Sequence, residues 1–161
     1  MIFKTHLALG FLIGILFITI FPQKLPILFI FLVTIFSALP DIDHPNSKYG
    51  RKLKIISWPI HLIFKHRGFF HSVFPPIILF FVLSYFNLRY LGLAVLVGYT
   101  AHLIGDAVTK EGINFLHPFS IFHIRGPIRT GAIMETLVFY ILIVFDLIYS
   151  LKLLGLLHYF V

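Results

Sequence analysis

Uncharged, largely apolar runs alternate with polar segments along the chain. Runs free of Asp, Glu, Lys and Arg cover residues 5–23, 25–40, 68–88 and 90–105, and a fifth apolar region extends from about residue 132 to 154. A helix that crosses the ~30 Å hydrocarbon core of a bilayer needs about 20 apolar residues, and about 17 suffice at the short end. The pattern therefore predicts about five transmembrane helices, of which the shorter ones tilt little or thin the bilayer.

Residues that favour turns divide the predicted helices into two hairpins and a final helix. Pro22 and Pro26 lie between the first and second spans, and Asn87 lies between the third and fourth. The polar stretches 40–71 and 108–131 mix large apolar residues with lysines and arginines. This mixture is typical of segments that lie in the headgroup layer, so we expect interfacial helices within the loops.

Composition agrees with a membrane protein and excludes several other classes. The chain of 161 residues is 59% hydrophobic and 12% charged, whereas soluble domains average roughly 45–50% and about 25%. A core of this size cannot bury that much apolar surface, which excludes a soluble enzyme.

The chain has no cysteine, which excludes a disulfide scaffold and a thiolate metal site. We expect an all-α fold, a polytopic membrane helix bundle formed by residues 1–161 as one integral membrane domain.

Basic residues are distributed unevenly between the two sides of the predicted bundle. With alternating crossings, ten of the thirteen lysines and arginines fall on the side of the N-terminus and the two long loops, and the other three are Lys24, Arg89 and Lys152. Loops rich in Lys and Arg stay in the cytoplasm. We therefore expect a multi-pass protein of the inner cell membrane with a cytoplasmic N-terminus. The same bias explains the net charge of +7 without a nucleic-acid partner.

Ionisable residues next to the spans form four clusters. Such residues are costly in a membrane, so each cluster is a candidate site. The clusters are residues 5–6, 41–44, 66–72 and 102–106. The first and third helices begin, and the second and fourth end, on the same side of the bundle. The predicted topology therefore brings all four clusters to one face.

The residue types and spacings in these clusters favour a divalent metal. His102 and Asp106 are four residues apart, so both side chains project from one face of a helix. His66 and His71 share a target only if the segment before His71 is a loop, which Gly68 permits. Imidazole and carboxylate ligands without thiolate suit zinc, with manganese or iron as alternatives. More than four candidate ligands allow an open coordination position or two ions.

These patterns lead to a hypothesis for the role of each residue. The metal ligands would be drawn from His6, Asp41, Asp43, His66, His71, His102 and Asp106. Asp43 and His66 would complete a second ion or act as base and acid. Arg67 would hold an anionic group, with help from Lys48 or Arg51.

The same motifs resemble a known family. Thr-His at 5–6, Leu-Pro-Asp-Ile-Asp-His at 39–44, His-Arg-Gly-x-x-His-Ser at 66–72 and His-x-x-Gly-Asp-x-x-Thr-x-x-Gly at 102–112 follow one another in this order. They resemble the YdjM-type family of small inner-membrane proteins, regarded as membrane-bound, metal-dependent hydrolases. The resemblance covers about residues 5–120 and implies metal ligands at those His and Asp positions. The helix with His102 and Asp106 is also similar to one in all-helical zinc phospholipases C and nucleases, which is an analogy between sites.

Together, residues and resemblance favour a metal-dependent hydrolase, phosphoesterase-like, that acts on a membrane lipid or lipid-linked substrate at the cytoplasmic face. Two alternatives belong to other classes. One is a non-enzymatic carrier of divalent metal or protons, which needs polar groups at several depths, and only Glu135 and Asp146 suggest such a continuation. The other is a membrane scaffold whose structural metal site is saturated with protein ligands.

Overall fold

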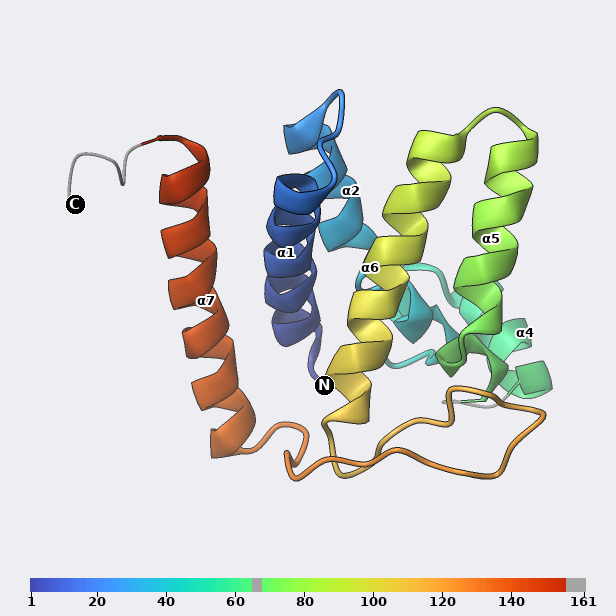
Figure 1. Ribbon diagram of the computed structural model, residues 1–161. Helices are drawn as coiled ribbons and strands as arrows, with labels where there is room; N and C mark the ends of the chain where they lie inside the picture. Colours follow the sequence, from blue (N-terminus) through green and yellow to red (C-terminus); the bar gives the residue numbers. More distant parts are fainter. Residues whose placement is uncertain (65–67, 156–161) are drawn as a thin grey trace.

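A computed structural model describes residues 1–64 and 68–155, and it is helical throughout apart from loops and two isolated β-bridges (Figure 1). This confirms the all-α prediction. With η denoting a 3-10 helix, the elements are α1 (Phe3–Ile20), α2 (Pro26–Phe36), η1 (Pro40–Asp43), α3 (Lys48–Lys52), α4 (Lys54–Phe64), η2 (Phe69–His71), α5 (Phe74–Tyr85), α6 (Arg89–Ala107) and α7 (Ile133–Leu153).

Four segments of the described chain are long and apolar enough to cross a membrane. They are Phe3–Ile20, Pro26–Asp43, Arg89–Ala107 and Ile133–Leu153, and the second of them combines α2 with η1. The shorter apolar helix α5 stands where the uncharged run 68–88 predicted a third span. Pro75 and Pro76 lie in its first turn, where their missing N–H groups cost least, and the residues before them form η2 and a short loop.

Helices α1, α2 and α6 pack closely because small residues lie where they cross. A Cβ atom added at Gly10 of α1 would lie 2.4 Å from Cβ of Ser37, just after α2. A Cβ atom at Gly98 of α6 would lie 2.5 Å from the carbonyl oxygen of Val33. Small residues of this kind let membrane helices approach closely. They bring α1 and α6 against the last turn of α2.

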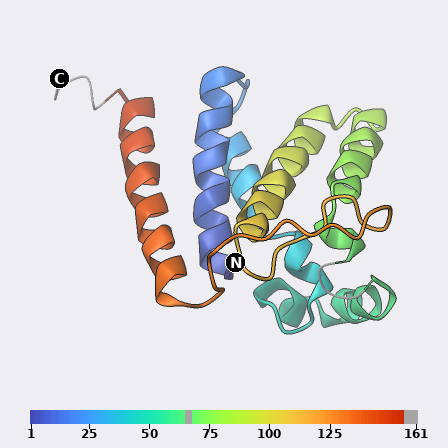
Figure 2. The ribbon, with the colours of Figure 1, turned by 60° about the horizontal axis from the view of Figure 1, so that its bottom comes forward.

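The described residues of all four sequence clusters lie at one end of the bundle, which we call the site end. Helices α1, α5 and α7 begin there, and α2 and α6 finish there (Figure 1). The long loop between α6 and α7 crosses the site end (Figure 2). Helix α7 stands to one side and packs on α1, where Nζ of Lys4 lies 4.6 Å from the ring centroid of Phe139.

The start of α7 is attached to the start of α1 by one buried carboxylate. Glu135 accepts hydrogen bonds from the backbone N–H groups of Ile2 and Gly131, both at 2.6 Å. Glu135 therefore joins two chain segments at the site end, a placement the sequence left open.

Candidate metal centre

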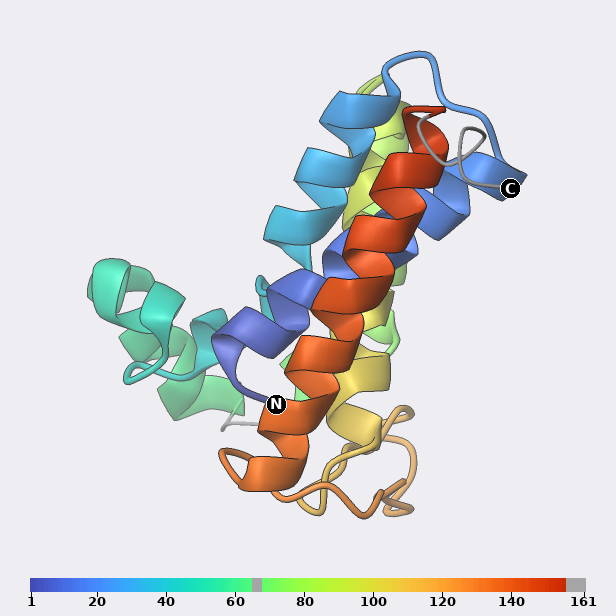
Figure 3. The ribbon, with the colours of Figure 1, turned by 90° about the vertical axis from the view of Figure 1, so that its left-hand side faces the viewer.

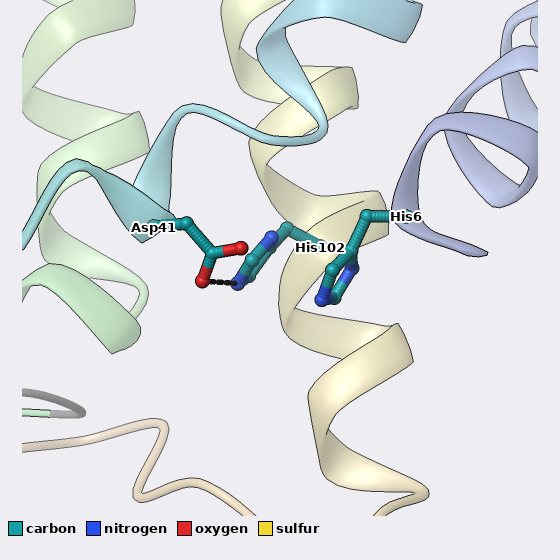
Figure 4. Close-up of side chains that lie close together, drawn as sticks. All are labelled: His6, Asp41 and His102. Atoms are coloured by element: carbon teal, nitrogen blue, oxygen red, sulfur yellow. Dashed lines mark ion pairs between the residues drawn. The ribbon is translucent and has the colours of Figure 1, made fainter. Parts of the chain in front are cut away.

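Six of the seven predicted ligands lie together at the site end. They come from four elements: His6 from α1, Asp41 and Asp43 from η1, His71 from η2, and His102 and Asp106 from α6. Figure 4 shows three of them, with Asp41 and His6 approaching His102 from opposite sides. The group is almost fully buried except for the Asp41 side chain, which is 17% exposed. His66 and Arg67 lie outside the described residues.

The orientation of His102 is fixed by a backbone carbonyl group. Nδ1 of His102 lies 2.8 Å from the carbonyl oxygen of Ser37, and a carbonyl oxygen can only accept a hydrogen bond. Nδ1 must therefore carry a proton, and in the neutral ring Nε2 presents a lone pair. Nε2 lies 3.6 Å from Oδ2 of Asp106, one turn along the same helix, and 3.8 Å from Oδ1 of Asp41.

A buried carboxylate orients His71 in the same way. Nδ1 of His71 lies 3.1 Å from Oδ2 of Asp43, and Nε2 is directed toward the other candidate ligands. Nε2 of His71 lies 3.2 Å from Nε2 of His102 and 3.6 Å from Oδ2 of Asp106. Burial lowers the pKa of His71 below its usual value, which favours the neutral ring that a metal ligand must be.

His6 is buried without the hydrogen bonds that its ring nitrogens would normally make. Its ring stacks on that of His102, with centroids 3.8 Å apart and an interplanar angle of 12°. Nε2 lies 3.3 Å from Oδ1 of Asp106, yet within the described chain neither ring nitrogen makes a hydrogen bond. A buried polar atom without a partner costs free energy, and coordination would remove that cost.

The spacing of the donor atoms fits a divalent ion. Two sets, His6–Asp41–His102 and His71–His102–Asp106, each offer three ligand atoms within 4.8 Å of one another. Ligands bound at about 2.1 Å around a tetrahedral ion are separated by roughly 3.4 Å, and the separations between His71, His102 and Asp106 are 3.2 to 3.6 Å. Because His102 belongs to both sets, the arrangement accommodates one ion or two neighbouring ions.

The electrostatics of the site also favour a bound cation. Three carboxylates, from Asp41, Asp43 and Asp106, lie around imidazoles buried from water. The amino group of Met1 pairs with Oδ1 of Asp106. Buried carboxylates that lie close together need such positive partners, and a divalent ion supplies more positive charge than one ammonium group.

A pocket of about 310 Å³ leads to the partly exposed edge of the site. Its lining residues are Met1, Ile2, Phe3, Asp41, His44, Ser47, Lys48 and Thr130. Nζ of Lys48 lies 4.7 Å from the ring centroid of Phe3. Larger pockets of about 510 and 360 Å³ lie along α2 and α7 and are lined by apolar and hydroxyl side chains without ionisable groups. The Asp41 pocket therefore brings a candidate ligand together with a lysine.

Two residues that hold candidate ligands in place, Ser37 and Tyr99, are not of a type that the sequence pattern identifies as a metal ligand. Ser37 acts through its backbone carbonyl, while its hydroxyl donates to the carbonyl oxygen of His6 at 2.8 Å. Tyr99 donates to the carbonyl oxygen of Phe70 at 2.6 Å and so holds the residue before His71. The only sequence signal for Tyr99 is its position three residues before His102, on the same helix face.

Comparisons with known proteins agree with a membrane assignment. The sequence matches the family described as YdjM inner membrane protein over residues 1–160. It is 39% identical over 105 residues to the uncharacterized protein YvsG of Bacillus subtilis. This aligned region covers 63% of this chain and 65% of YvsG. It is 38% identical over 89 residues to the inner membrane protein YdjM of Escherichia coli. This aligned region covers 50% of this chain and 44% of that protein. The matched segments thus span less than two thirds of these relatives. No solved structure matches the chain significantly.

Proposed function

The chain belongs to the YdjM family of inner membrane proteins, and from that premise we propose that it is a metal-dependent hydrolase of the membrane surface. Its substrate would be a phosphoester of a membrane lipid or of a lipid-linked molecule. The observation that carries this proposal is the approach of Nε2 of His71, Nε2 of His102 and Oδ2 of Asp106 to within 3.2–3.6 Å of one another, close to an accessible pocket.

Five residues would hold the metal. They are His6, Asp41, His71, His102 and Asp106, and zinc suits these nitrogen and oxygen donors best, with manganese or iron as alternatives. A bound divalent ion supplies Lewis-acid chemistry and lowers the pKa of water to about 7, which makes hydroxide available at neutral pH.

Asp43 would support catalysis by positioning His71. Its Oδ2 lies 3.1 Å from Nδ1 of His71, so the carboxylate would favour a proton on Nδ1 and leave Nε2 without one. Because Asp43 faces the far side of that ring, this geometry favours a positioning role over a role as base or as ligand of a second ion. The assignment of His66 as acid and Arg67 as the residue that holds the anionic group remains a prediction from sequence.

The pocket beside Asp41 would admit the anionic part of the substrate. Lys48 lines this pocket with Asp41, so its ammonium group could bind phosphoryl oxygens close to the ligand set. Phe3 and Ile2 give the same pocket an apolar wall. A phosphate with an attached apolar chain matches this combination of charge and apolar surface.

The accessible edge of the site favours a hydrolase over the two alternatives. A structural metal site is closed by protein ligands, whereas the Asp41 carboxylate is partly exposed and lines a pocket. A carrier needs polar groups through the membrane, whereas the described ligands gather at one end, and Asp146 lies on α7 apart from them. With the N-terminus in the cytoplasm, as the basic loops suggest, the site would face the inner leaflet.

The experiment that tests this function compares bound metal and hydrolysis in matched histidine variants. Protein purified in detergent is analysed for divalent metals and screened against phospholipids and isoprenoid phosphates. His102→Ala should lose both metal and hydrolysis, because it removes a ligand shared by both candidate sets. The control is His123→Ala, since His123 is exposed and its Nδ1 contacts the carbonyl oxygen of Ile121 in the same loop. Metal-loaded protein that hydrolyses none of these phosphoesters would refute the enzymatic proposal.

A further inference from the structure

Helix α4 carries an apolar stripe on its exposed face. Ile55, Trp58 and Leu62 lie within about 60° of one another around a helix with 3.6 residues per turn, and Ile55 and Trp58 are 91% and 61% exposed. A neighbouring face of α4 is attached to the protein, because Ser57 is buried and Nδ1 of His61 lies 3.0 Å from the carbonyl oxygen of Asp43. A helix on the surface of a soluble protein shows the reverse pattern, with its polar face outward.

A second exposed apolar surface lies at the tip of the α6–α7 loop, residues 116–122. Phe119, Ile121 and Phe122 all point outward, and Ile121 is 95% exposed. The loop is held in place by packing on the start of α5. The backbone N–H of Val73 donates to the carbonyl oxygen of Phe115 at 2.9 Å, and the ring centroids of Phe74 and Phe119 are 5.4 Å apart.

Both surfaces lie at the site end of the bundle. In Figure 3, α4 projects from one side of that end and the α6–α7 loop from the other. Helix α5 has 12 residues, which span about 18 Å and leave much of a ~30 Å hydrocarbon layer uncovered. The end of α5 away from the site is joined to the start of α6 by a short turn (Figure 1). The part of the hydrocarbon layer that α5 does not span therefore lies toward the site end. There the loop tip packs on Phe74 through Phe119.

Exposed cations accompany both apolar surfaces. Arg51, Lys52 and Lys54 are exposed at the start of α4, and Lys110 and Arg125 are exposed in the α6–α7 loop. Large apolar side chains beside lysines and arginines are the combination by which an interfacial segment binds an anionic leaflet. A soluble partner or a second copy of this chain would not explain why the apolar surfaces accompany a helix too short for the bilayer.

We propose that the α4 stripe and the loop tip are two lipid-binding anchors that insert at the headgroup–acyl boundary of the leaflet at the site end. Their ligand is the surface of an anionic phospholipid bilayer. Each anchor is connected by a hydrogen bond to the backbone at or near a candidate ligand. His61 of α4 contacts the carbonyl oxygen of Asp43, and the loop accepts from the N–H of Val73, two residues after His71. The anchors therefore hold the candidate metal centre at the leaflet surface. This inference does not depend on hydrolysis.

Trp58 gives a direct test because it is the only tryptophan in the chain. The protein is reconstituted in vesicles containing phosphatidylglycerol, and Trp58 emission is measured with lipids brominated near the top of the acyl chain and with aqueous iodide. Insertion predicts roughly twofold quenching by the brominated lipid and little quenching by iodide, since an interfacial side chain lies about 5–10 Å into the boundary region. Strong iodide quenching without lipid quenching would overturn the proposal. Protection from both quenchers would also overturn it, by showing that protein covers Trp58.

Variants extend the test to the second anchor and control for misfolding. In the Trp58→Phe background, Phe122→Trp should show the same quenching by brominated lipid. In the otherwise native chain, Ile55→Asp together with Leu62→Asp should reduce lipid quenching of Trp58, whereas Ile133→Asp, an exposed isoleucine at the start of α7, should not. Unchanged quenching in the double variant would contradict an anchor formed by this stripe.

Discussion

Nε2 of His71 lies 3.2 Å from Nε2 of His102, although the two residues come from different elements, η2 and α6. On each ring the other nitrogen faces a hydrogen-bond acceptor, the Asp43 carboxylate for His71 and the Ser37 carbonyl for His102. When both rings are neutral, two lone pairs therefore face each other in a buried site with Asp106 beside them. This arrangement is unfavourable without a cation and favourable with one, which is the physical basis of the proposed metal centre.

We predict that Asp43→Asn weakens metal binding without abolishing it. The neutral amide would favour a proton on Nδ1 of His71 less strongly than the carboxylate does, and loss of such a partner typically lowers metal affinity about 10–100-fold. The measurement is a competition titration with a chromophoric chelator. Asn46→Ala, an exposed side chain after the same segment, is the control that should leave affinity unchanged. Equal affinities in Asp43→Asn and the native protein would exclude the positioning role.

Protonation of His71 should destabilise the metal-free protein at mildly acidic pH. Burial lowers the folded-state pKa of His71, so the folded protein binds the proton less readily than the unfolded chain. The contribution of His71 to the free energy of unfolding is therefore complete above about pH 6.5, the pKa of histidine in the unfolded chain. It is lost as the pH falls below that value. Thermal unfolding of native protein and His71→Gln in detergent from pH 8 to pH 5 tests this. The native protein should lose more stability on acidification, and parallel pH profiles would contradict the prediction.

Lys48→Met should weaken substrate binding while leaving the metal in place. Lys48 lines the pocket with Asp41 but is not among the candidate ligands. Loss of one charge-assisted hydrogen bond to phosphate costs about 1.5–3 kcal/mol, so KM should rise at least about tenfold. Lys24→Met, an exposed lysine in the turn between α1 and α2 and outside the pocket, is the matched control. A lower metal content in Lys48→Met, or an unchanged KM, would contradict the assignment.

Gly98→Ala should destabilise the bundle at the crossing of α2 and α6. The new Cβ would lie 2.5 Å from the carbonyl oxygen of Val33, a backbone atom that cannot move away easily. Overpacking of this kind costs about 1–3 kcal/mol. Unfolding in detergent measures the change, and Thr100→Ala, at an exposed position on the same helix, should have a much smaller effect. Equal stability of the two variants would show that this crossing is looser than the structure indicates.

The fold followed from the sequence because apolar runs of membrane length leave few alternatives. The all-helical class and the approximate number of spans were correct. The predicted length of the third span was wrong. The whole run 68–88 is uncharged and was therefore predicted as one helix, but only Phe74–Tyr85 forms it. Counting charges does not reveal that Pro75 and Pro76 fix the first turn and that η2 precedes it.

The candidate site was predictable in its residue types and only partly in its geometry. The topology alone required the clusters to meet at one end, and the described candidate ligands do lie there. The different placements of Asp41 at the pocket and Asp43 behind His71 depend on the turn η1, which the residue pattern did not specify. Backbone groups such as the Ser37 carbonyl carry no signal in sequence, because every residue has one.

Elemental analysis of the purified protein tests the central claim most directly. Native protein prepared in detergent, without added chelator, should contain one or two divalent ions per chain, with zinc favoured by the donor set. His71→Ala combined with His102→Ala should remove that metal while His123→Ala retains it. Native protein that remains folded but binds no divalent metal, even after incubation with zinc, manganese or iron(II), would contradict the account.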